Sequence, residues 1–315
     1  LRFQPPQPVT AWDVVYDGTE FGPSAPQPEM PVAEDSLQLP KEPTDEDCLF
    51  LNVYTPAADD KRRPVLFWIH GGGYVVGSGR AYDGSVFVEE HDVVVVTINY
   101  RMGALGFMHV GHLDPALSSS VNNGILDQIC ALEWTRDNIA AFGGDPDNVL
   151  IFGESAGATS TAMLLACPKA EGLFHKAVVH SPHVDLITVE EGGAEFTNRC
   201  IKRLGGDPDV NGMATLREAT ADELNALVFP DFNDHEAFQP PALSIRTAAN
   251  VTFSPAIDGV LIPGPVAEAI KSKGAGNVPI IGGGCRHEGT LFPTALGFKP
   301  DGSDFTEAEA RAMFT

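Results

Sequence analysis

The sequence lacks the features that would place it among membrane or nucleic-acid-binding proteins. No apolar run approaches the roughly 18 residues that a transmembrane helix requires. Positive charge is scarce: 20 Lys and Arg stand against 43 Asp and Glu, which gives a net charge of −23 at pH 7. Nucleic acid and anionic membrane surfaces would repel such a chain, so neither is an expected partner. No positively charged and then apolar leader is visible after Leu1.

Cysteine is also scarce, and its spacing argues against metal and disulfide frameworks. The five cysteines are Cys48, Cys130, Cys167, Cys200 and Cys285. Their number is odd, and their spacing matches neither a zinc site nor a set of disulfides. We therefore expect these cysteines to bind no metal. The 315 residues, 43% of them hydrophobic, suit one large globular domain or two small ones.

Short apolar runs alternate with helical patterns after a proline-rich segment, residues 1–43, that is expected to be extended. The expected strands are residues 48–55, 64–70, 91–100, 149–152, 176–180 and 278–282. The clearest helix is 124–142, whose apolar residues are spaced for one buried face and which Gly143-Gly144 would stop. The alternation predicts an α/β fold with a mostly parallel central sheet and helices on both faces.

The pattern loosens between residues 185 and 275 into shorter helical pieces and loops that contain proline. We interpret 185–275 as a helical insertion over the active-site edge of the sheet, not as a second domain. The whole chain, 1–315, is then a single domain.

The stretch from Gly153 to Gly157 is the strongest functional signal. It reads Gly-Glu-Ser-Ala-Gly, follows a short apolar strand and precedes a helix. This pattern is typical of a nucleophile elbow, in which two glycines permit a strained turn with the serine at its apex. Ser155 would also lie where helix N–H groups favour negative charge. Ser155 is therefore the expected nucleophile, and a glycine-serine turn without chemistry is the alternative.

A glycine loop upstream can supply an oxyanion hole. The sequence His70-Gly-Gly-Gly73 directly follows the expected strand 64–70. Esterases with such a motif use the loop after this strand to hold the oxyanion. The expected donors are the N–H groups of Gly72, Gly73 and Ala156. A flexible loop without function is the alternative.

Longer motifs in the same order resemble those of the type-B carboxylesterase (cholinesterase-like) family of α/β-hydrolases. Besides the two motifs above, they are residues 46–54, 99–107, 123–134 and 138–146. The resemblance covers nearly the whole chain and implies an α/β-hydrolase fold that is incomplete at both ends. It places the family's opening hairpin before Leu1 and its catalytic histidine beyond residue 315.

The resemblance implies a Ser–Glu–His triad. The family's acidic motif corresponds to Arg286-His287-Glu288-Gly289, so Glu288 is the implied acid. Triad order in this fold is nucleophile, acid, histidine, and no histidine follows Glu288 here. Ser155 then lacks a general base, and the chain as given is expected to be inactive. The complete protein would hydrolyse a small ester through an acyl-enzyme, a reaction for which no metal and no organic cofactor is expected.

Two other interpretations stay open. A self-contained esterase of the hormone-sensitive-lipase-like group would use Ser155, Asp258 and His287 as its triad. A non-catalytic binding protein of cholinesterase-like fold would need no triad, although such relatives usually lose the serine.

Departures from the family pattern bear on the substrate. Cholinesterases place a tryptophan in the loop that corresponds to 27–47, where it holds a quaternary ammonium by a cation–π contact. This loop contains neither Trp nor Tyr, so an uncharged carboxylic ester is expected in place of a choline ester. Tyr74 and Glu154 are the candidate substrate-binding residues, and packing is the alternative for Tyr74.

Cys48 matches the second cysteine of a family disulfide, but the implied partner position is Ala25. Cys48 is therefore expected to be a free thiol. The missing disulfide favours a bacterial-type or cytosolic protein. No oligomeric state follows from the sequence.

Overall fold

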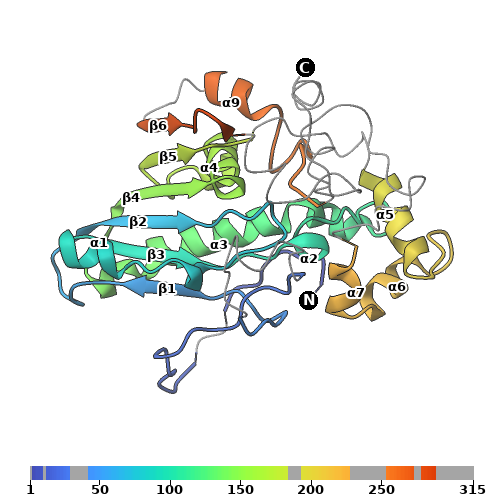
Figure 1. Ribbon diagram of the computed structural model, residues 1–315, viewed down its shortest axis with the longest axis horizontal. Helices are drawn as coiled ribbons and strands as arrows, with labels where there is room; N and C mark the ends of the chain where they lie inside the picture. The colour runs from blue at the N-terminus through green and yellow to red at the C-terminus, as the bar shows by residue number, and fades with distance from the viewer. Residues whose placement is uncertain are drawn as a thin grey trace.

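The centre of the molecule is a six-stranded sheet (Figure 1). The computed structural model describes residues 2–9, 12–28, 42–183, 193–227, 253–272 and 278–288. The strands are β1 (Leu51–Tyr54), β2 (Arg63–Ile69), β3 (Val94–Ile98), β4 (Gly144–Glu154), β5 (Lys176–His180) and β6 (Ile280–Gly283), in the spatial order β1-β3-β2-β4-β5-β6. Only β1 is antiparallel to its neighbour among these pairs. The predicted mostly parallel sheet is confirmed.

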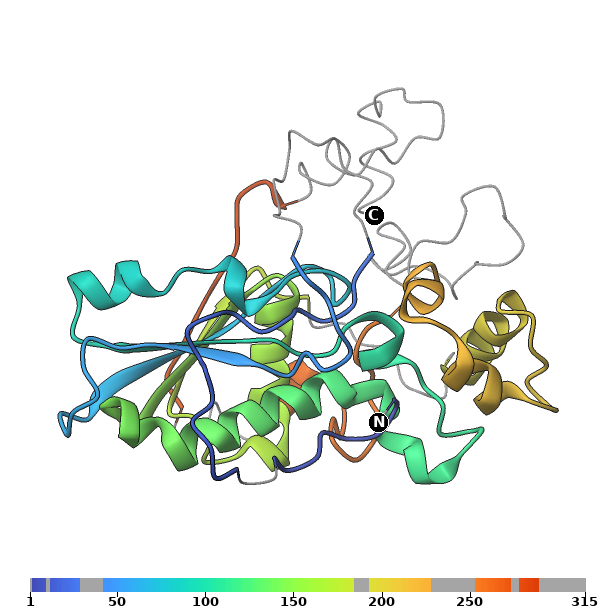
Figure 2. The same ribbon diagram turned by 90° about the horizontal axis from the view of Figure 1, so that it is seen from below.

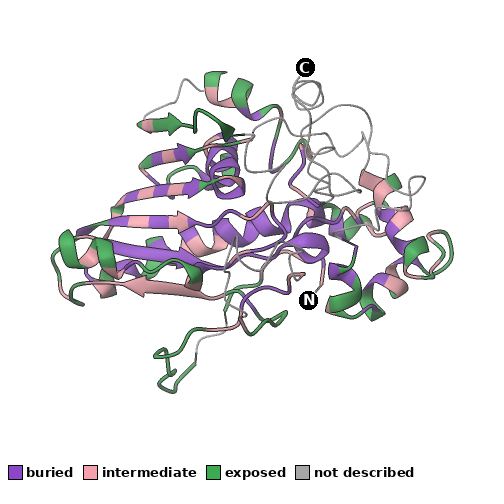
Figure 3. Cartoon of the chain, viewed as in Figure 1, coloured by how far each residue is buried: buried purple, intermediate pink, exposed green. Residues whose placement is uncertain are grey.

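The central strands are the buried ones, as their composition requires. All five residues of β3 are buried, and four of them are β-branched valine or isoleucine, which suit a strand covered on both faces. By contrast, β1 is half-buried and most of β6 is exposed, which Figure 3 shows at the two edges of the sheet. The core therefore lies around β2, β3 and β4.

Helices cover both faces of this sheet, and Figure 2 shows α1 and α3 on opposite sides of the strands. The described α-helices are α1 (Ser85–Glu90), α2 (Gly103–Phe107), α3 (Asn123–Asn138), α4 (Ala156–Ala166), α5 (Gly193–Arg203), α6 (Gly212–Glu218), α7 (Ala221–Asn225) and α9 (Val266–Ser272). Short 3-10 helices are η1 (Gly79–Ala81), η2 (Pro115–Asn122), η3 (Ile139–Phe142) and η4 (Pro168–Ala170). None of the described helices is long and apolar enough to cross a membrane.

Several predicted boundaries were wrong by a few residues. The helix expected over 124–142 ends as an α-helix at Asn138 and continues as the 3-10 helix η3. Gly143 does end it, with a left-handed φ of 76° that glycine adopts without strain. The strand expected over 149–152 begins earlier, at Gly144, because that glycine already pairs with Arg63 of β2. The strands expected over 48–55 and 91–100 are shorter, at Leu51–Tyr54 and Val94–Ile98.

The segment that we interpreted as an insertion contains α5, α6 and α7, while α9 near its end packs against α4. In Figure 1 the arrowheads of β2, β4 and β5 point toward the side on which α5, α6 and α7 lie. These helices are therefore on the side of the carboxyl ends of the parallel strands.

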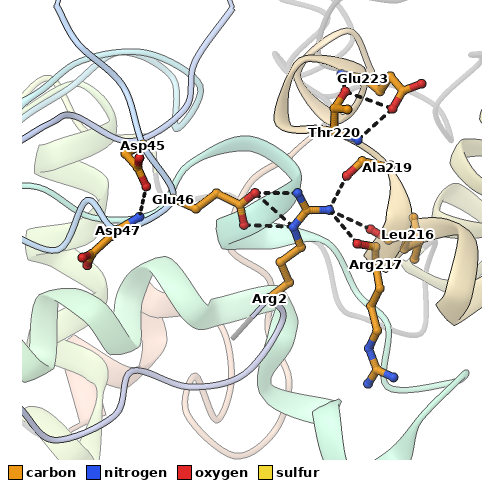
Figure 4. A network of polar contacts seen from close by, with 9 residues as sticks. All are labelled: Arg2, Asp45, Glu46, Asp47, Leu216, Arg217, Ala219, Thr220 and Glu223. Carbon is orange, nitrogen blue, oxygen red and sulfur yellow. Dashed lines mark hydrogen bonds and ion pairs between the residues drawn. The ribbon is translucent and has the colours of Figure 1, made fainter.

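Arg2, near the start of the chain, forms hydrogen bonds with the C-terminal end of α6 (Figure 4). The Arg2 guanidinium forms an ion pair with the Glu46 carboxylate, in which Nε donates to Oε2 at 2.9 Å. It also donates to the carbonyl oxygens of Leu216, at 3.3 Å, of Arg217, at 3.1 Å, and of Ala219. Carbonyls at a helix C-terminus have no partner within the helix, so a cation there satisfies them.

A buried ion pair fixes the segment that follows β3. The Arg101 guanidinium donates to both carboxylate oxygens of Asp127 in α3, at 2.8 and 2.7 Å, and the Arg101 backbone N–H adds a third bond at 3.0 Å. The geometry is bidentate, which is the strong form of such a pair. Residues after β3 are thereby held against α3.

Candidate active site

Ser155 lies in a strained turn between β4 and α4. Its φ of 56° and ψ of −120° are unusual for a residue with a side chain. A Cβ on Gly157 would come within 2.0 Å of the Ile69 carbonyl oxygen, and one on Gly153 would come within 2.4 Å of Gly157. The two glycines therefore let the turn press against the end of β2. The Ser155 N–H donates to the His180 carbonyl at 3.0 Å, which fixes the turn to β5.

The glycine loop after β2 lies beside this turn. A Cβ on Gly71 would lie 3.3 Å from the Ser155 Cβ, so the loop backbone directly adjoins the serine. Gly72 and Gly73 have φ values of 100° and 64°. The Gly72 carbonyl accepts the N–H groups of Val75 and Val76, each at 3.1 Å, which closes the loop into a tight turn. Only glycine fits at 72, where a Cβ would lie 2.0 Å from the Val76 carbonyl oxygen.

Within the described residues, three backbone donors in the glycine loop and the nucleophile turn have no protein acceptor. In the part of the chain that the structure describes, the N–H groups of Gly72, Gly73 and Ala156 donate to no protein oxygen. Ala156 is the first residue of α4, whose N-terminal N–H groups also lack partners within the helix. N–H groups without a protein acceptor, in a loop that adjoins the serine and at the helix start after it, are available to hold an oxyanion.

Glu288 lies on the same edge of the sheet, after β6. Its Oε1 accepts the Ser181 hydroxyl and the Cys285 N–H, both at 2.5 Å. Ser181 follows β5 directly and donates its own N–H to the Gly283 carbonyl at 2.7 Å. The Ser181 hydroxyl, and then the Cys285 N–H, hold the pKa of Glu288 below its usual range. A charged carboxylate is therefore fixed two strands away from the nucleophile turn.

Ser181 is a residue that the sequence analysis missed. The β4–β5–β6 register pairs Glu154 with His180 and His180 with Gly283, so the residues that follow these strands meet at one edge. The sequence did contain a signal, since a serine directly follows the expected strand 176–180. Polar residues at the carboxyl ends of parallel strands often contribute to a site.

Glu154, a candidate substrate-binding residue, is exposed at this edge. Partial burial of its carboxyl raises the pKa of Glu154, and the negative charge of Glu288 raises it further, while His180 opposes both. The two carboxylates are therefore close enough to repel each other. Contact of Glu154 with a substrate stays a prediction.

Tyr74, the other candidate, points into the core. Its side chain is 5% exposed, and its ring centroid lies 4.9 Å from that of Phe107 and 6.5 Å from that of Tyr100. Its hydroxyl accepts a hydrogen bond from Ser160 at 3.3 Å. These contacts support a packing role next to the glycine loop, and contact with a substrate stays a prediction.

Among the described residues, Asp258 and His287 of the alternative triad share no hydrogen bond or ion pair. The Asp258 carboxylate accepts the N–H groups of Val260, at 3.0 Å, and Ile262, at 2.9 Å, and the Asn122 side-chain amide at 2.9 Å. Within the described residues these three groups account for its hydrogen bonds. Asp258 therefore stabilises a turn against the start of α3.

Cys48 is a free thiol, as predicted, and it is buried. Burial raises the pKa of Cys48 to about 12, and the charge of Asp127 contributes to the rise. The implied partner position, Ala25, is buried as well. The Cys48 side chain is therefore an apolar core group and takes no part in the site.

Comparisons with known proteins find relatives that are similar over nearly the whole chain. The para-nitrobenzyl esterase of Bacillus subtilis (strain 168) is 38% identical over 302 residues, which cover 95% of this chain and 58% of that protein. The liver carboxylesterase of Sus scrofa is 38% identical over 318 residues, covering 95% and 53%. A crystal structure of a Geobacillus stearothermophilus carboxylesterase at pH 6.2 matches with a TM-score of 0.81 and 39% identity, covering 99% of this chain and 60% of that one.

The chain thus spans little more than half the length of these relatives. A sequence model described as the carboxylesterase family matches residues 1–312, which is nearly the whole chain. The match includes both the glycine loop and the nucleophile turn. The chain therefore belongs to the carboxylesterase family of serine hydrolases and has part of its α/β-hydrolase fold.

Proposed function

We propose that the protein hydrolyses carboxylic esters with Ser155 as the nucleophile. The observation that carries this proposal is the position of Ser155 in a strained turn beside the glycine loop, where the N–H groups of Gly72, Gly73 and Ala156 donate to no protein oxygen among the described residues. The Ser155 Oγ attacks the ester carbonyl carbon, and the N–H groups of Gly72, Gly73 and Ala156 hold the oxyanion that forms. Collapse of this intermediate expels the alcohol and leaves an acyl-enzyme, which water then hydrolyses.

Glu288 is proposed as the triad acid. Its carboxylate would accept the imidazole N–H of the general base and stabilise the imidazolium that forms when the base takes the Ser155 proton. No histidine follows Glu288 within this sequence. We propose that this histidine belongs to a part of the protein outside residues 1–315, so that these residues alone turn over esters poorly.

The proposed substrate class is uncharged carboxylic esters. The loop 27–47 carries no Trp or Tyr that could hold a quaternary ammonium, which argues against a choline ester. One relative is named for a para-nitrobenzyl substrate, which is consistent with an uncharged ester. The alternative triad receives no support, because the Asp258 carboxylate is occupied by backbone N–H groups.

The test compares hydrolysis of a short-chain p-nitrophenyl ester by residues 1–315, by the product of the complete natural gene, and by its Ser155→Ala and His287→Ala variants. The proposal predicts an active complete product, loss of activity in Ser155→Ala, little change in His287→Ala, and a nearly inactive 1–315 chain. Strong activity of residues 1–315 that disappears in His287→Ala would overturn the assignment of Glu288.

A non-catalytic binding protein is the second candidate, and covalent labelling separates it from an enzyme. A fluorophosphonate probe should react with Ser155 of the complete product and fail to react with Ser155→Ala. A complete product that takes up no label and hydrolyses no ester would favour the binding protein.

A further inference from the structure

The first residue of the glycine loop is enclosed by one tyrosine. The His70 side chain is 1% exposed, and its imidazole stacks on the Tyr100 ring with centroids 4.3 Å apart and planes at 16°. The Tyr100 hydroxyl donates to the His70 carbonyl oxygen at 2.9 Å. Tyr100 is itself fully buried. One side chain therefore contacts both the ring and the backbone of His70.

The imidazole also contacts the loop backbone through its Nδ1 atom. The His70 Nδ1 lies 2.8 Å from the Gly71 carbonyl oxygen. Burial lowers the pKa of His70 to about 4, so near neutral pH the ring is uncharged and Nδ1–H donates to that carbonyl. A Cβ on Gly77 would come within 2.5 Å of Nδ1. The imidazole thus fixes the carbonyl of Gly71, and with it the peptide plane that carries the Gly72 N–H.

The segment after β3 also holds the far end of the loop. The Gly103 N–H donates to the Tyr74 carbonyl at 2.8 Å, and Tyr74 adopts a φ of 65°. Tyr100 and Gly103 therefore hydrogen-bond to the first and the last carbonyl of the loop 70–74. The bidentate pair between Arg101 and Asp127 fixes this segment in turn against α3.

We propose that Tyr100 is a positioning residue for the oxyanion hole. Through the His70 carbonyl and the stacked imidazole it sets the orientation of the peptide groups from Gly71 to Gly73. Oxyanion donors accelerate a reaction only when they are already oriented toward the charge that develops. This inference rests on the proposed function of Ser155 and adds a residue that touches neither the substrate nor the nucleophile.

Tyr100→Phe tests the inference, because it removes one hydroxyl and keeps the stacked ring. In the product of the complete natural gene we expect kcat to fall about 10- to 100-fold, since misplacement by about 1 Å can reduce a rate about 100-fold. KM should change less than about twofold, because the ground-state carbonyl uses the donors weakly. The affinity for a trifluoromethyl ketone, which forms a tetrahedral adduct on the serine, should fall in proportion to kcat/KM.

The matched control is Tyr54→Phe, at a half-buried tyrosine of β1 that pairs with Val95 at the start of β3, whereas Tyr100 follows the end of that strand. It should leave kcat and the trifluoromethyl ketone affinity unchanged. A purely structural role for Tyr100 would lower the melting temperature and leave the kinetic constants of the folded enzyme equal to those of the control. That result would overturn the inference.

Gly77→Ala gives a second perturbation, since its Cβ would come within 2.5 Å of the His70 Nδ1 and 2.9 Å of the Gly71 carbonyl oxygen, at a φ of 117° that suits glycine. It should reduce kcat and trifluoromethyl ketone affinity together, as Tyr100→Phe does. Full activity of Ser155→Ala would overturn the proposed function itself, and this outcome is distinct from a failure of the Tyr100 inference. The Tyr100 inference fails if Ser155→Ala is inactive while Tyr100→Phe retains the parent kcat, whatever Gly77→Ala does.

Discussion

The Ser181 hydroxyl donates to the Glu288 carboxylate at 2.5 Å, and this bond holds the candidate acid at the edge where Ser155 lies. Ser181 is itself tied to the neighbouring strand, because its N–H donates to the Gly283 carbonyl at 2.7 Å. The residue before it, His180, accepts the N–H of Ser155. The nucleophile turn and the candidate acid are therefore linked by hydrogen bonds to His180 and Ser181, two consecutive residues at the end of β5.

Removal of this hydroxyl should change the pH dependence of activity. The Ser181 hydroxyl is the main cause of the lowered pKa of Glu288, because it stabilises the charged form. In Ser181→Ala that pKa rises, so activity should disappear at a higher pH on the acid side than in the parent. We also expect kcat to fall about tenfold, because the carboxylate is positioned less accurately without this bond. The pH–rate profile of the complete product measures the shift in pH dependence and the fall in kcat. Ser118→Ala, at an exposed serine, is the control. Superimposable profiles of Ser181→Ala and the parent would contradict the prediction.

Glu288→Gln should have a larger effect than any change at Ser181. The amide keeps the size of the side chain and removes the charge that would stabilise an imidazolium. By analogy with the acid of a serine-protease triad, kcat should fall about 10³- to 10⁴-fold. Turnover of a p-nitrophenyl ester measures the change, and the exposed Glu171→Gln on the surface is the matched control. Equal kcat values for the two variants would exclude Glu288 as the acid.

The sheet and the nucleophile turn could be predicted from sequence because their causes are local. An apolar run, two glycines and a helical pattern together fix the turn at Ser155, and the structure shows that each glycine faces backbone at less than 2.5 Å. The end of the helix at Gly143 was equally local, since its left-handed φ suits glycine.

Ser181 and the orientation of Tyr74 could not be predicted in this way. Ser181 gains its role from the register of β4, β5 and β6, which joins residues more than a hundred positions apart. Tyr74 has a side chain that could face either a cavity or the core, and its contact with Phe107 decides for the core. Both depend on which elements become neighbours, and no short stretch of sequence carries that information.

Gly157→Ala should prevent correct folding of the turn. The added Cβ would lie 2.0 Å from the Ile69 carbonyl oxygen and 2.8 Å from that of His70, and backbone cannot move aside as a flexible side chain can. We expect a loss of about 3 kcal/mol or more in the free energy of unfolding. Urea denaturation measures it against Gly264→Ala, where nothing lies within 4 Å of the new Cβ. Similar midpoints for the two variants would show that the turn is not tightly packed.

The buried imidazole of His70 should make folding stability depend on pH. Burial lowers the pKa of His70 from 6.5 to about 4, so between these values the unfolded chain binds a proton that the folded chain does not. Stability is therefore fully present above about pH 6.5 and declines as the pH falls toward 4. The loss from this group at pH 5 is roughly 2 kcal/mol relative to pH 7.5. Urea denaturation of the parent and of His70→Gln at pH 7.5 and at pH 5 measures this loss. Between the two pH values the free energy of unfolding should fall more in the parent than in the variant. Equal losses would contradict the prediction.

Arg2 should stabilise α6 far more than its neighbour Arg217 does. The Arg2 side chain is 17% exposed and joins the Glu46 carboxylate to three carbonyls at the end of α6, which its replacement would leave unpaired. Arg2→Ala should therefore lower the free energy of unfolding by about 2 kcal/mol and speed amide hydrogen exchange in α6 and α7. Arg217 is 53% exposed and pairs with Asp114 at 3.7 Å, a geometry worth little in water, so Arg217→Ala should change stability by less than about 0.5 kcal/mol. Equal effects of the two variants would mean that the Arg2 contacts do not hold the helix.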